Sequence, residues 1–385
     1  MILPAIAGLL VIFVVLWEAF ETVVLPRRVT RRFRFAVLYY RNTWRVWRAA
    51  ARFIHKPARR ESFLSYYGPL SLLILFVIWA FAIIFGFALL DRSAADFSSL
   101  HENFSTLLYL SGTTMFTLGL GDVIPHSGLQ RVFTVFESGL GLGFLALVLS
   151  YLPVIYQAFS RREVNIVLLD ARAGSPPTAA ELLRRHTGEG GMVELFQLLH
   201  DWERAAAEIL ESHISYPVVC YFRSQHNNES WLGALVAILD ACALLVSHRE
   251  DACSRQARLT FAICRHTVVD LAQVFYTPPE SKADRLPPAE LERLRAALSQ
   301  TPYKLNGSPE ADAKMAKLRA MYEPYAEALA KRFAVDLPPW ILSREITDNW
   351  RTTAWGRISS ASASASAPAS ANARSAETVP DAHAD

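Results

Sequence analysis

The chain has 385 residues, of which 52% are hydrophobic and 19% charged, and its formal net charge is +3. Soluble proteins carry about 25% charged residues, and four cysteines are too few for a disulfide-rich secreted scaffold. Positions 1–60 hold 12 basic and two acidic residues, against 27 basic and 34 acidic residues in the remainder, which argues against a uniformly basic nucleic-acid-binding protein.

The first predicted element is a transmembrane helix over residues 1–25. Positions 2–17 carry no charge, and the apolar character continues to position 25 apart from Glu18 and Glu21. A signal peptide would begin with basic residues and end at a small-residue cleavage site, whereas here the basic residues follow the apolar run. We therefore predict an uncleaved anchor, and we expect the two glutamates to pair structurally with the basic segment.

The basic segment, residues 26–61, is predicted to form an amphipathic helix at the cytoplasmic membrane surface. Arg41, Arg45, Arg48 and Arg52 recur at spacings of 4, 3 and 4, so they share one helical face that suits anionic lipid headgroups. Aromatic residues suited to a membrane interface lie among them: Tyr40, Trp44, Trp47 and Phe53. A voltage sensor would need arginine at every third position inside an apolar span, which the sequence does not have.

Two more spans follow, at 62–90 and 138–160, which are uncharged and long enough to cross a bilayer. Because positive charge favours the cytoplasmic side, residues 26–60 set the orientation. We expect a multi-pass protein of the cell membrane with its N-terminus outside and its C-terminal domain in the cytoplasm.

Residues 91–137 between these spans are too apolar for an ordinary exposed loop. Ser99 and Glu102 form a capping-box pattern that opens a helix reaching Met115. That helix is too short to cross the membrane and return, so it would be re-entrant, followed by irregular backbone at 117–122. Such backbone is tolerated at membrane depth only where protein buries it or where it lines an aqueous path.

The irregular stretch suits the second option. Gly119 and Gly121 permit positive φ at alternate positions, which lets successive carbonyls face one side. Carbonyls from several copies would replace the hydration shell of a cation. Asp122 would stand at the outer mouth and Thr117 would add a hydroxyl at the inner end.

Residues 109–125, with Thr117, Leu118, Gly119, Leu120, Gly121 and Asp122 in order, resemble the pore loop of potassium channels, whose signature is TVGYGD. The resemblance is closest to the two-transmembrane and two-pore branch and covers about 62–160, the predicted pore domain. It implies a selectivity filter at 117–121, K+ coordination by the backbone carbonyls of residues 117–120, and a homotetramer around one pore. Leu118 and Leu120 replace the valine and tyrosine of the signature, and Leu120 can only pack where tyrosine also hydrogen-bonds.

The third span carries two candidate bending points, Gly141 and Pro153. The resemblance places the inner-helix hinge at Gly141, while close helix packing is an equally weighted interpretation. We interpret Glu137 as a structural partner rather than an ion ligand. We also hypothesise that Tyr109 provides a polar brace for Asp122.

Residues 161–357 are predicted to form an all-α cytoplasmic domain, and residues 358–385 a disordered Ser/Ala-rich tail. A capping box is expected at Thr178 and Glu181, and further helices at 192–214, 230–247, 255–275, 288–299 and 309–335. The apolar stretch 231–246 is short and contains Asp240, so a buried helix is favoured over a fourth span. Core packing is expected for all four cysteines, Cys220, Cys242, Cys253 and Cys264.

The predicted protein is thus an all-α membrane protein with three transmembrane helices, a re-entrant pore helix with a filter loop, and an all-α cytoplasmic domain. The expected function is passive, potassium-selective conduction, with no enzymatic activity, no cofactor beyond the permeant ion and no nucleic-acid partner. Two alternatives stay open: a weakly selective cation channel and a non-conducting, membrane-anchored signalling or scaffold protein. The ligand of the cytoplasmic domain is not readable from the sequence.

Overall fold

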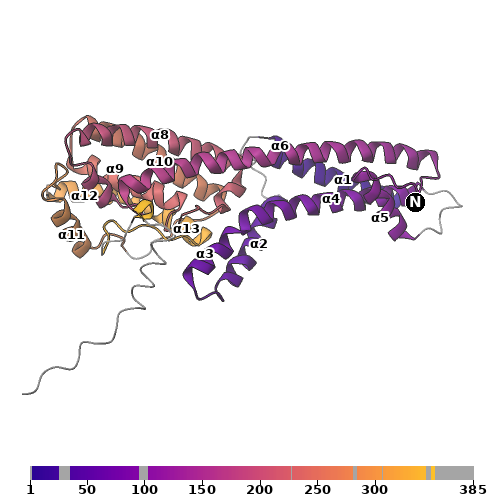
Figure 1. The fold of residues 1–385 in the computed structure, drawn as a ribbon, viewed down its shortest axis with the longest axis horizontal. Coiled ribbons are helices and arrows are strands. Elements are labelled where there is room, and N and C mark those ends of the chain that lie inside the picture. The colour runs from indigo at the N-terminus through magenta and orange to yellow at the C-terminus, as the bar shows by residue number, and fades with distance from the viewer. Residues whose placement is uncertain are drawn as a thin grey trace, which may run out of the picture.

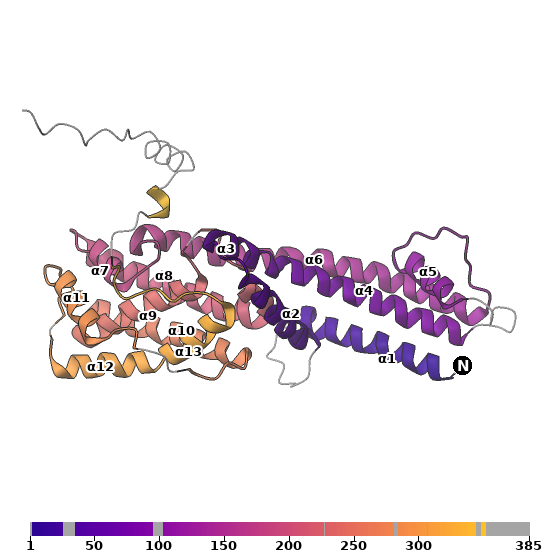
Figure 2. The same ribbon diagram turned by 90° about the horizontal axis from the view of Figure 1, so that it is seen from below.

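The computed structural model is an elongated molecule with long apolar helices at one end and a helical bundle at the other (Figures 1 and 2). It describes residues 2–25, 35–94, 103–226, 228–280, 284–305, 307–343 and 348–351. Within these ranges the regular secondary structure is helical and contains no strand, so the predicted all-α class is confirmed.

The apolar end is built from three long helices. Helix α1 (Ile2–Ala19) continues through one π-helical segment, η1 (Phe20–Val24), and packs along α4 (Tyr67–Ser93), with α6 (Gly128–Ala173) beside α4. All three are long and apolar enough to cross a membrane. The short α5 (Phe104–Met115) lies between α4 and α6 at the end where the chain begins, away from the bundle (Figure 1).

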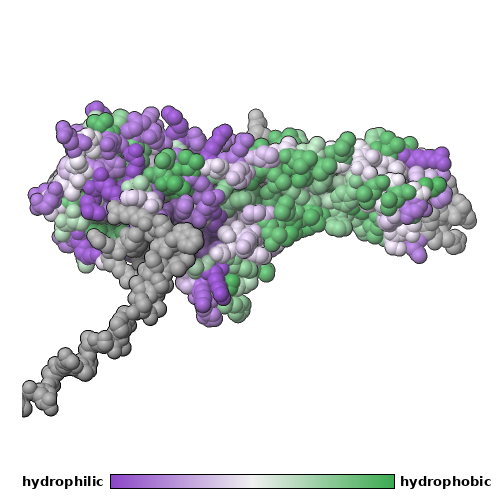
Figure 3. Space-filling model, in the orientation of Figure 1, coloured by the Kyte–Doolittle hydropathy of each residue, from purple (hydrophilic) through white to green (hydrophobic). Residues whose placement is uncertain are grey.

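The surface of this end is apolar over a broad band, as Figure 3 shows. Within the most apolar 18-residue window of α6, only 11% of the residues are buried, and large side chains such as Leu142, Leu145 and Leu149 are exposed. An apolar surface of this extent is typical of contact with lipid or with further protein chains.

Glu18 does not have the arginine partner that the sequence suggested among the described residues. Its carboxylate accepts hydrogen bonds from the backbone N–H groups of Phe35 (2.8 Å) and Ala36 (3.3 Å), at the start of the next helix. A carboxylate at a helix N-terminus satisfies free N–H groups and complements the helix dipole. Glu18 therefore caps that helix, while Glu21 accepts a bond from Trp17 Nε1 at 2.9 Å.

The basic segment contains two helices, α2 (Phe35–Ala51) and α3 (Pro57–Ser65), and not a single one. Pro57 occupies the first turn of α3, where proline is favoured because its missing N–H is not needed there. Because α2 ends at Ala51, Arg52 lies in the turn after the helix and not on the predicted helical face.

Two of the aromatic residues on α2, Trp44 and Trp47, have protein contacts that the sequence did not predict. Trp44 is buried, its ring contacts Tyr67 and Tyr221, and its Nε1 donates to the carbonyl of Arg332 at 2.7 Å. Trp47 stacks on Phe63 of α3. Helix α2 thus joins the apolar end to the helical bundle.

The four arginines predicted to share one helical face lie in different environments. Arg48 Nη1 donates to the carbonyl of Lys331 in the bundle at 2.7 Å. Arg45 and Arg52 are exposed, and Arg41 is half-buried. Arg48 therefore binds protein, and lipid contact of the other three stays a prediction.

The bundle contains seven helices within the described ranges: α7 (Ala179–Arg185), α8 (Gly191–Ser215), α9 (Trp231–His248), α10 (Ala252–Val274), α11 (Pro288–Leu298), α12 (Pro309–Ala320) and α13 (Glu323–Phe333). Half of the predicted capping box is present, since Thr178 Oγ1 accepts from Glu181 N at 3.2 Å. The Glu181 carboxylate binds Arg184 and Arg185 instead of closing the box. The predicted single helix over 309–335 is wrong, because the chain turns between α12 and α13. Pro324 lies in the first turn of α13, where its missing N–H is tolerated, and it would interrupt a helix that continued from α12.

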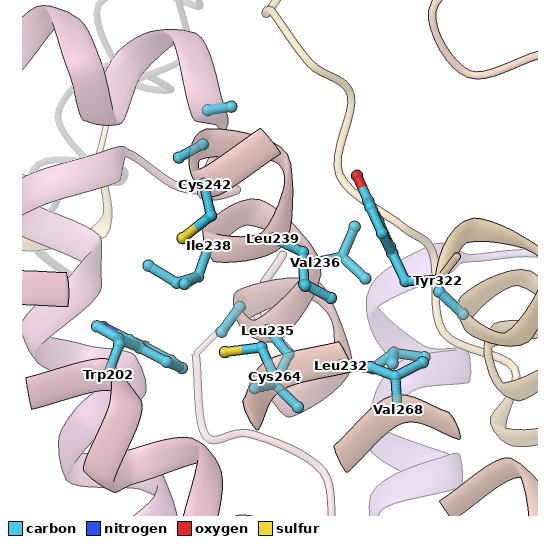
Figure 4. Packing of buried hydrophobic residues seen from close by; sticks show 14 of the residues in the cluster. Trp202, Leu232, Leu235, Val236, Ile238, Leu239, Cys242, Cys264, Val268 and Tyr322 are labelled. Atoms are coloured by element: carbon cyan, nitrogen blue, oxygen red, sulfur yellow. The ribbon is translucent and has the colours of Figure 1, made fainter. Parts of the chain in front are cut away.

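Helix α9 is the centre of the bundle. It is also long and apolar enough to cross a membrane, but its apolar stretch is 89% buried, against 11% for α6, which agrees with the predicted buried helix. Figure 4 shows its side chains packed between those of α8, α10 and the Tyr322 region. All four cysteines are free and buried, so their predicted packing role is confirmed.

The apolar end and the bundle share one helix, because α6 continues without a break from the third span to Ala173. Arg162, just beyond the apolar part, is buried and donates to the Glu163 carboxylate (2.9 and 3.1 Å) and to the carbonyls of Val219 (3.0 Å) and Phe222 (2.9 Å). Those carbonyls lie at the short 3₁₀ helix Pro217–Tyr221, which follows α8. Arg162 therefore joins α6 to the segment that follows α8.

Candidate functional site

The predicted pore loop is built on α5, a helix of 12 residues. At 1.5 Å per residue it is about 18 Å long, less than the roughly 30 Å of a bilayer core. Asn103 is its N-cap residue, and the predicted capping pair Ser99 and Glu102 lies outside the described residues. The helix ends at Met115, and its C-cap residue Phe116 comes immediately before the predicted filter.

The backbone after α5 alternates between conformations. Thr117, Gly119 and Gly121 have φ values of 55°, 55° and 78°, all in the left-handed region. Glycine adopts this region freely, whereas threonine does so at a cost that surrounding structure must offset. The Thr113 carbonyl supports the turn by accepting from Leu118 N (2.7 Å) and Gly119 N (3.4 Å). The sequence indicated the two glycines but not the left-handed Thr117.

In the single chain, this loop is exposed. Leu118 and Leu120 are 62% and 65% exposed, and a Cβ built at Gly119 or Gly121 would meet no atom within 4 Å among the described residues. Exposed leucines beside an ordered, alternating backbone are typical of a surface that other protein covers.

The hypothesised brace is present. Tyr109 on α5 donates its hydroxyl proton to Asp122 Oδ2 at 2.9 Å, across the loop that follows the helix. A hydrogen bond to a carboxylate is stronger than a neutral one. This bond fixes the outer end of the loop to α5.

A buried contact fixes α5 to both neighbouring helices. Ser111 Oγ lies 2.9 Å from the carbonyl oxygen of Ile84 on α4 and is hydrogen-bonded to the Glu137 carboxyl group on α6. Ser111 and Glu137 are both buried. The interpretation of Glu137 as a structural partner agrees with this arrangement.

Gly141 lies where α6 meets the C-terminal end of α5. A Cβ at this position would stand 2.1 Å from the carbonyl oxygen of Met115, a distance no side chain tolerates. Close packing is therefore a role that the structure gives to Gly141. Helix α6 is continuous through Gly141 and Pro153, and their action as hinges stays a prediction.

The start of α6 is held by a capping box that was not predicted from the sequence. Ser127 Oγ accepts from Gln130 N (3.1 Å), and Gln130 Oε1 accepts from Ser127 N (3.0 Å). Gln130 Nε2 also donates to the carbonyl of Asp91 at 3.2 Å, which joins the outer ends of α4 and α6. The Ser-x-x-Gln spacing before an apolar run was the available signal.

Comparison with known proteins agrees with this site. Residues 72–157 match a family described as ion channel, and the match contains α5, the loop and most of the spanning part of α6. Over 234 residues the chain is 25% identical to an uncharacterized membrane protein of Bacillus subtilis (strain 168), YdjJ, covering 58% of this chain and 66% of that relative. No solved structure matches.

Proposed function

We infer that the chain, whose residues 72–157 match the ion channel family, forms a pore that conducts K+ passively across the membrane. The observation that carries this proposal is the loop after α5, in which left-handed residues alternate at Thr117, Gly119 and Gly121. An alternating backbone suits a row of carbonyls that replaces the water around a cation. The proposed ligands are the backbone carbonyls of residues 117–120, without covalent chemistry or a resident cofactor.

We propose a homotetramer around one pore. One loop offers carbonyls from a single side, so a cation would stay incompletely coordinated by one chain. The uncovered loop and the exposed apolar face of α6 support assembly through these surfaces. The proposed orientation places the N-terminus and α5 outside and the bundle in the cytoplasm, because residues 26–60 carry the positive charge.

The decisive experiment measures reversal potentials of the purified full chain in planar bilayers, with K+ on one side and Na+ on the other. A potassium-selective pore reverses near the potassium equilibrium potential and follows it as the gradient changes. A reversal potential that does not change with the K+/Na+ ratio favours a weakly selective cation channel. This channel is the second candidate because Leu120 replaces the tyrosine of the signature. Absence of current, together with a monomeric state in detergent, favours the scaffold alternative.

Tyr109→Phe tests the brace within this function. The substitution removes the hydroxyl that binds Asp122 and keeps the ring, so the outer end of the loop loses its hydrogen bond to α5. We expect the K+/Na+ permeability ratio to fall severalfold in the same bilayer measurement. Tyr66→Phe is the matched control, because the Tyr66 side chain is exposed and makes no hydrogen bond among the described residues. Unchanged selectivity and conductance in Tyr109→Phe would refute the brace.

A further inference from the structure

A cavity of about 370 Å³ lies between α6 and α8, where the apolar part of α6 ends. This volume is in the range of small-molecule sites. Figure 1 shows α8 running beside the part of α6 that enters the bundle. The cavity is distant from the loop at 116–125, which lies at the opposite end of the apolar helices.

The walls of the cavity differ in polarity along α6. Val154 and Ala158 belong to the last turns of the apolar span, and Arg161 and Asn165 follow on the next turns. Across from them, α8 contributes Glu208 together with other polar residues: Glu211 and Ser212. A molecule that fills this space would meet apolar groups toward the membrane and charged groups away from it.

Three exposed polar side chains that line the cavity have no protein partner in the described part of the chain. Within the described ranges, the side chains of Arg161, Gln157 and Glu208 make no hydrogen bond and no ion pair. The neighbouring Arg162 is, by contrast, fully engaged with Glu163 and backbone carbonyls. The Arg161 guanidinium group on α6 and the Glu208 carboxylate on α8 therefore line the same cavity, and each is available to a ligand.

We propose that this cavity binds the headgroup of a phospholipid with a phosphate and a primary ammonium group, that is, phosphatidylethanolamine. Arg161 binds the phosphate, with Gln157 as a second donor, and Glu208 accepts from the ammonium group. The acyl chains follow the exposed apolar side of α6 near Val154. A bound lipid ties α6 to α8, and this proposal is independent of whether the chain conducts ions.

The charge pattern favours this headgroup over the other common ones. Glu208 and Glu211 disfavour an anionic headgroup such as that of phosphatidylglycerol, because such a headgroup has no ammonium group to offset the repulsion between these carboxylates and its phosphate. A choline headgroup carries the same charges as ethanolamine but has no N–H to donate to Glu208. Ethanolamine and choline lipids with identical acyl chains therefore form a matched pair of probes.

The test titrates the purified full chain in detergent with these two lipids, with phosphatidylglycerol of the same acyl chains and with soluble phosphoethanolamine. Native mass spectrometry counts the bound molecules. We expect the dissociation constant of the tightest site to be about tenfold lower for the ethanolamine lipid than for the choline lipid, because only ethanolamine can donate a charge-assisted hydrogen bond to Glu208. Glu208→Gln should abolish this preference, and Arg161→Gln should weaken binding of both lipids. Arg172→Gln on α6 and Glu194→Gln on α8 are the controls, because both residues are exposed and lie outside the cavity.

Three outcomes would overturn the proposal. The first is equal affinity of the unmodified chain for the two lipids, or tighter binding of phosphatidylglycerol. The second is an equal effect of the control and cavity substitutions. The third is binding of soluble phosphoethanolamine as tight as that of the lipid, which would show that the acyl chains contribute nothing. Circular dichroism verifies that each variant is folded.

Discussion

Gly141→Ala is expected to abolish most of the ion flux through liposomes that contain the purified chain. The new methyl group would stand 2.1 Å from the Met115 carbonyl oxygen, so α5 must move away from α6. Overpacking of this kind costs about 1–3 kcal/mol, and the movement shifts the residues that carry the proposed filter. The measurement is K+ flux per incorporated protein, with helix content recorded by circular dichroism.

Gly139→Ala is the matched control on the same helix. A Cβ at Gly139 meets no atom within 4 Å in the described part of the chain, and alanine favours a helix over glycine. We expect this variant to retain the helix content and most of the flux of the unmodified chain. Equal flux in the two alanine variants would contradict the role of Gly141 in positioning α5.

The second large effect is expected in the bundle, at a buried ion pair. Asp240 on α9 is buried, and Arg285 donates to both of its carboxylate oxygens, at 3.2 and 2.8 Å. Tyr322 also donates its hydroxyl proton to Asp240. Arg285 binds the Glu323 carboxylate at 3.0 Å as well. This cluster joins α9, α13 and the segment before α11.

Arg285→Met is expected to destabilise the bundle strongly, because it leaves the Asp240 carboxylate buried without its cation. Breaking one partner of a buried pair costs about 3–5 kcal/mol, which lowers Tm by at least about 6 °C in a domain of this size. Arg293→Met is the control, since Arg293 pairs with Glu290 at an exposed site and such a pair contributes about 0–1 kcal/mol. Thermal unfolding followed by circular dichroism gives both values.

Two further measurements identify the buried charge as the cause. Burial raises the pKa of Asp240 and the Arg285 charge opposes this rise, so Arg285→Met raises the pKa further. A raised folded-state pKa gives stability at low pH that is lost as pH rises, so the Tm deficit should shrink from pH 7 to pH 5. The double variant Asp240→Asn with Arg285→Met removes the charge and should recover part of the loss. A pH-independent deficit without recovery would contradict this explanation.

The protein contacts of the basic segment could not be predicted from neighbouring residues in the sequence. Hydropathy and arginine spacing identified a helix, but they did not show that Trp44 would bind the Arg332 carbonyl, 288 residues away in sequence. An aromatic residue beside arginines suits a membrane interface and a protein interface equally well. Only the position of α13 distinguishes the two, because it supplies the partner atom.

The filter region was accessible from the sequence because its signals are local. Two glycines at alternate positions, a short helix before them and an acid after them lie within about 20 consecutive residues. The Tyr109–Asp122 bond was also foreseeable, since both ends lie in that stretch. The contacts of Ser111 with Ile84 and Glu137 were not, because they join three separate helices.

The sequence by itself determined the apolar spans, the uneven charge and the loop whose glycines permit an alternating backbone. These properties follow from neighbouring residues, through hydropathy and backbone preference. The tertiary structure decided that Gly141 packs on Met115, that α2 contacts the bundle and that α6 and α8 enclose a cavity with free charges. Such contacts join residues far apart in the chain, and they depend on how the helices pack together.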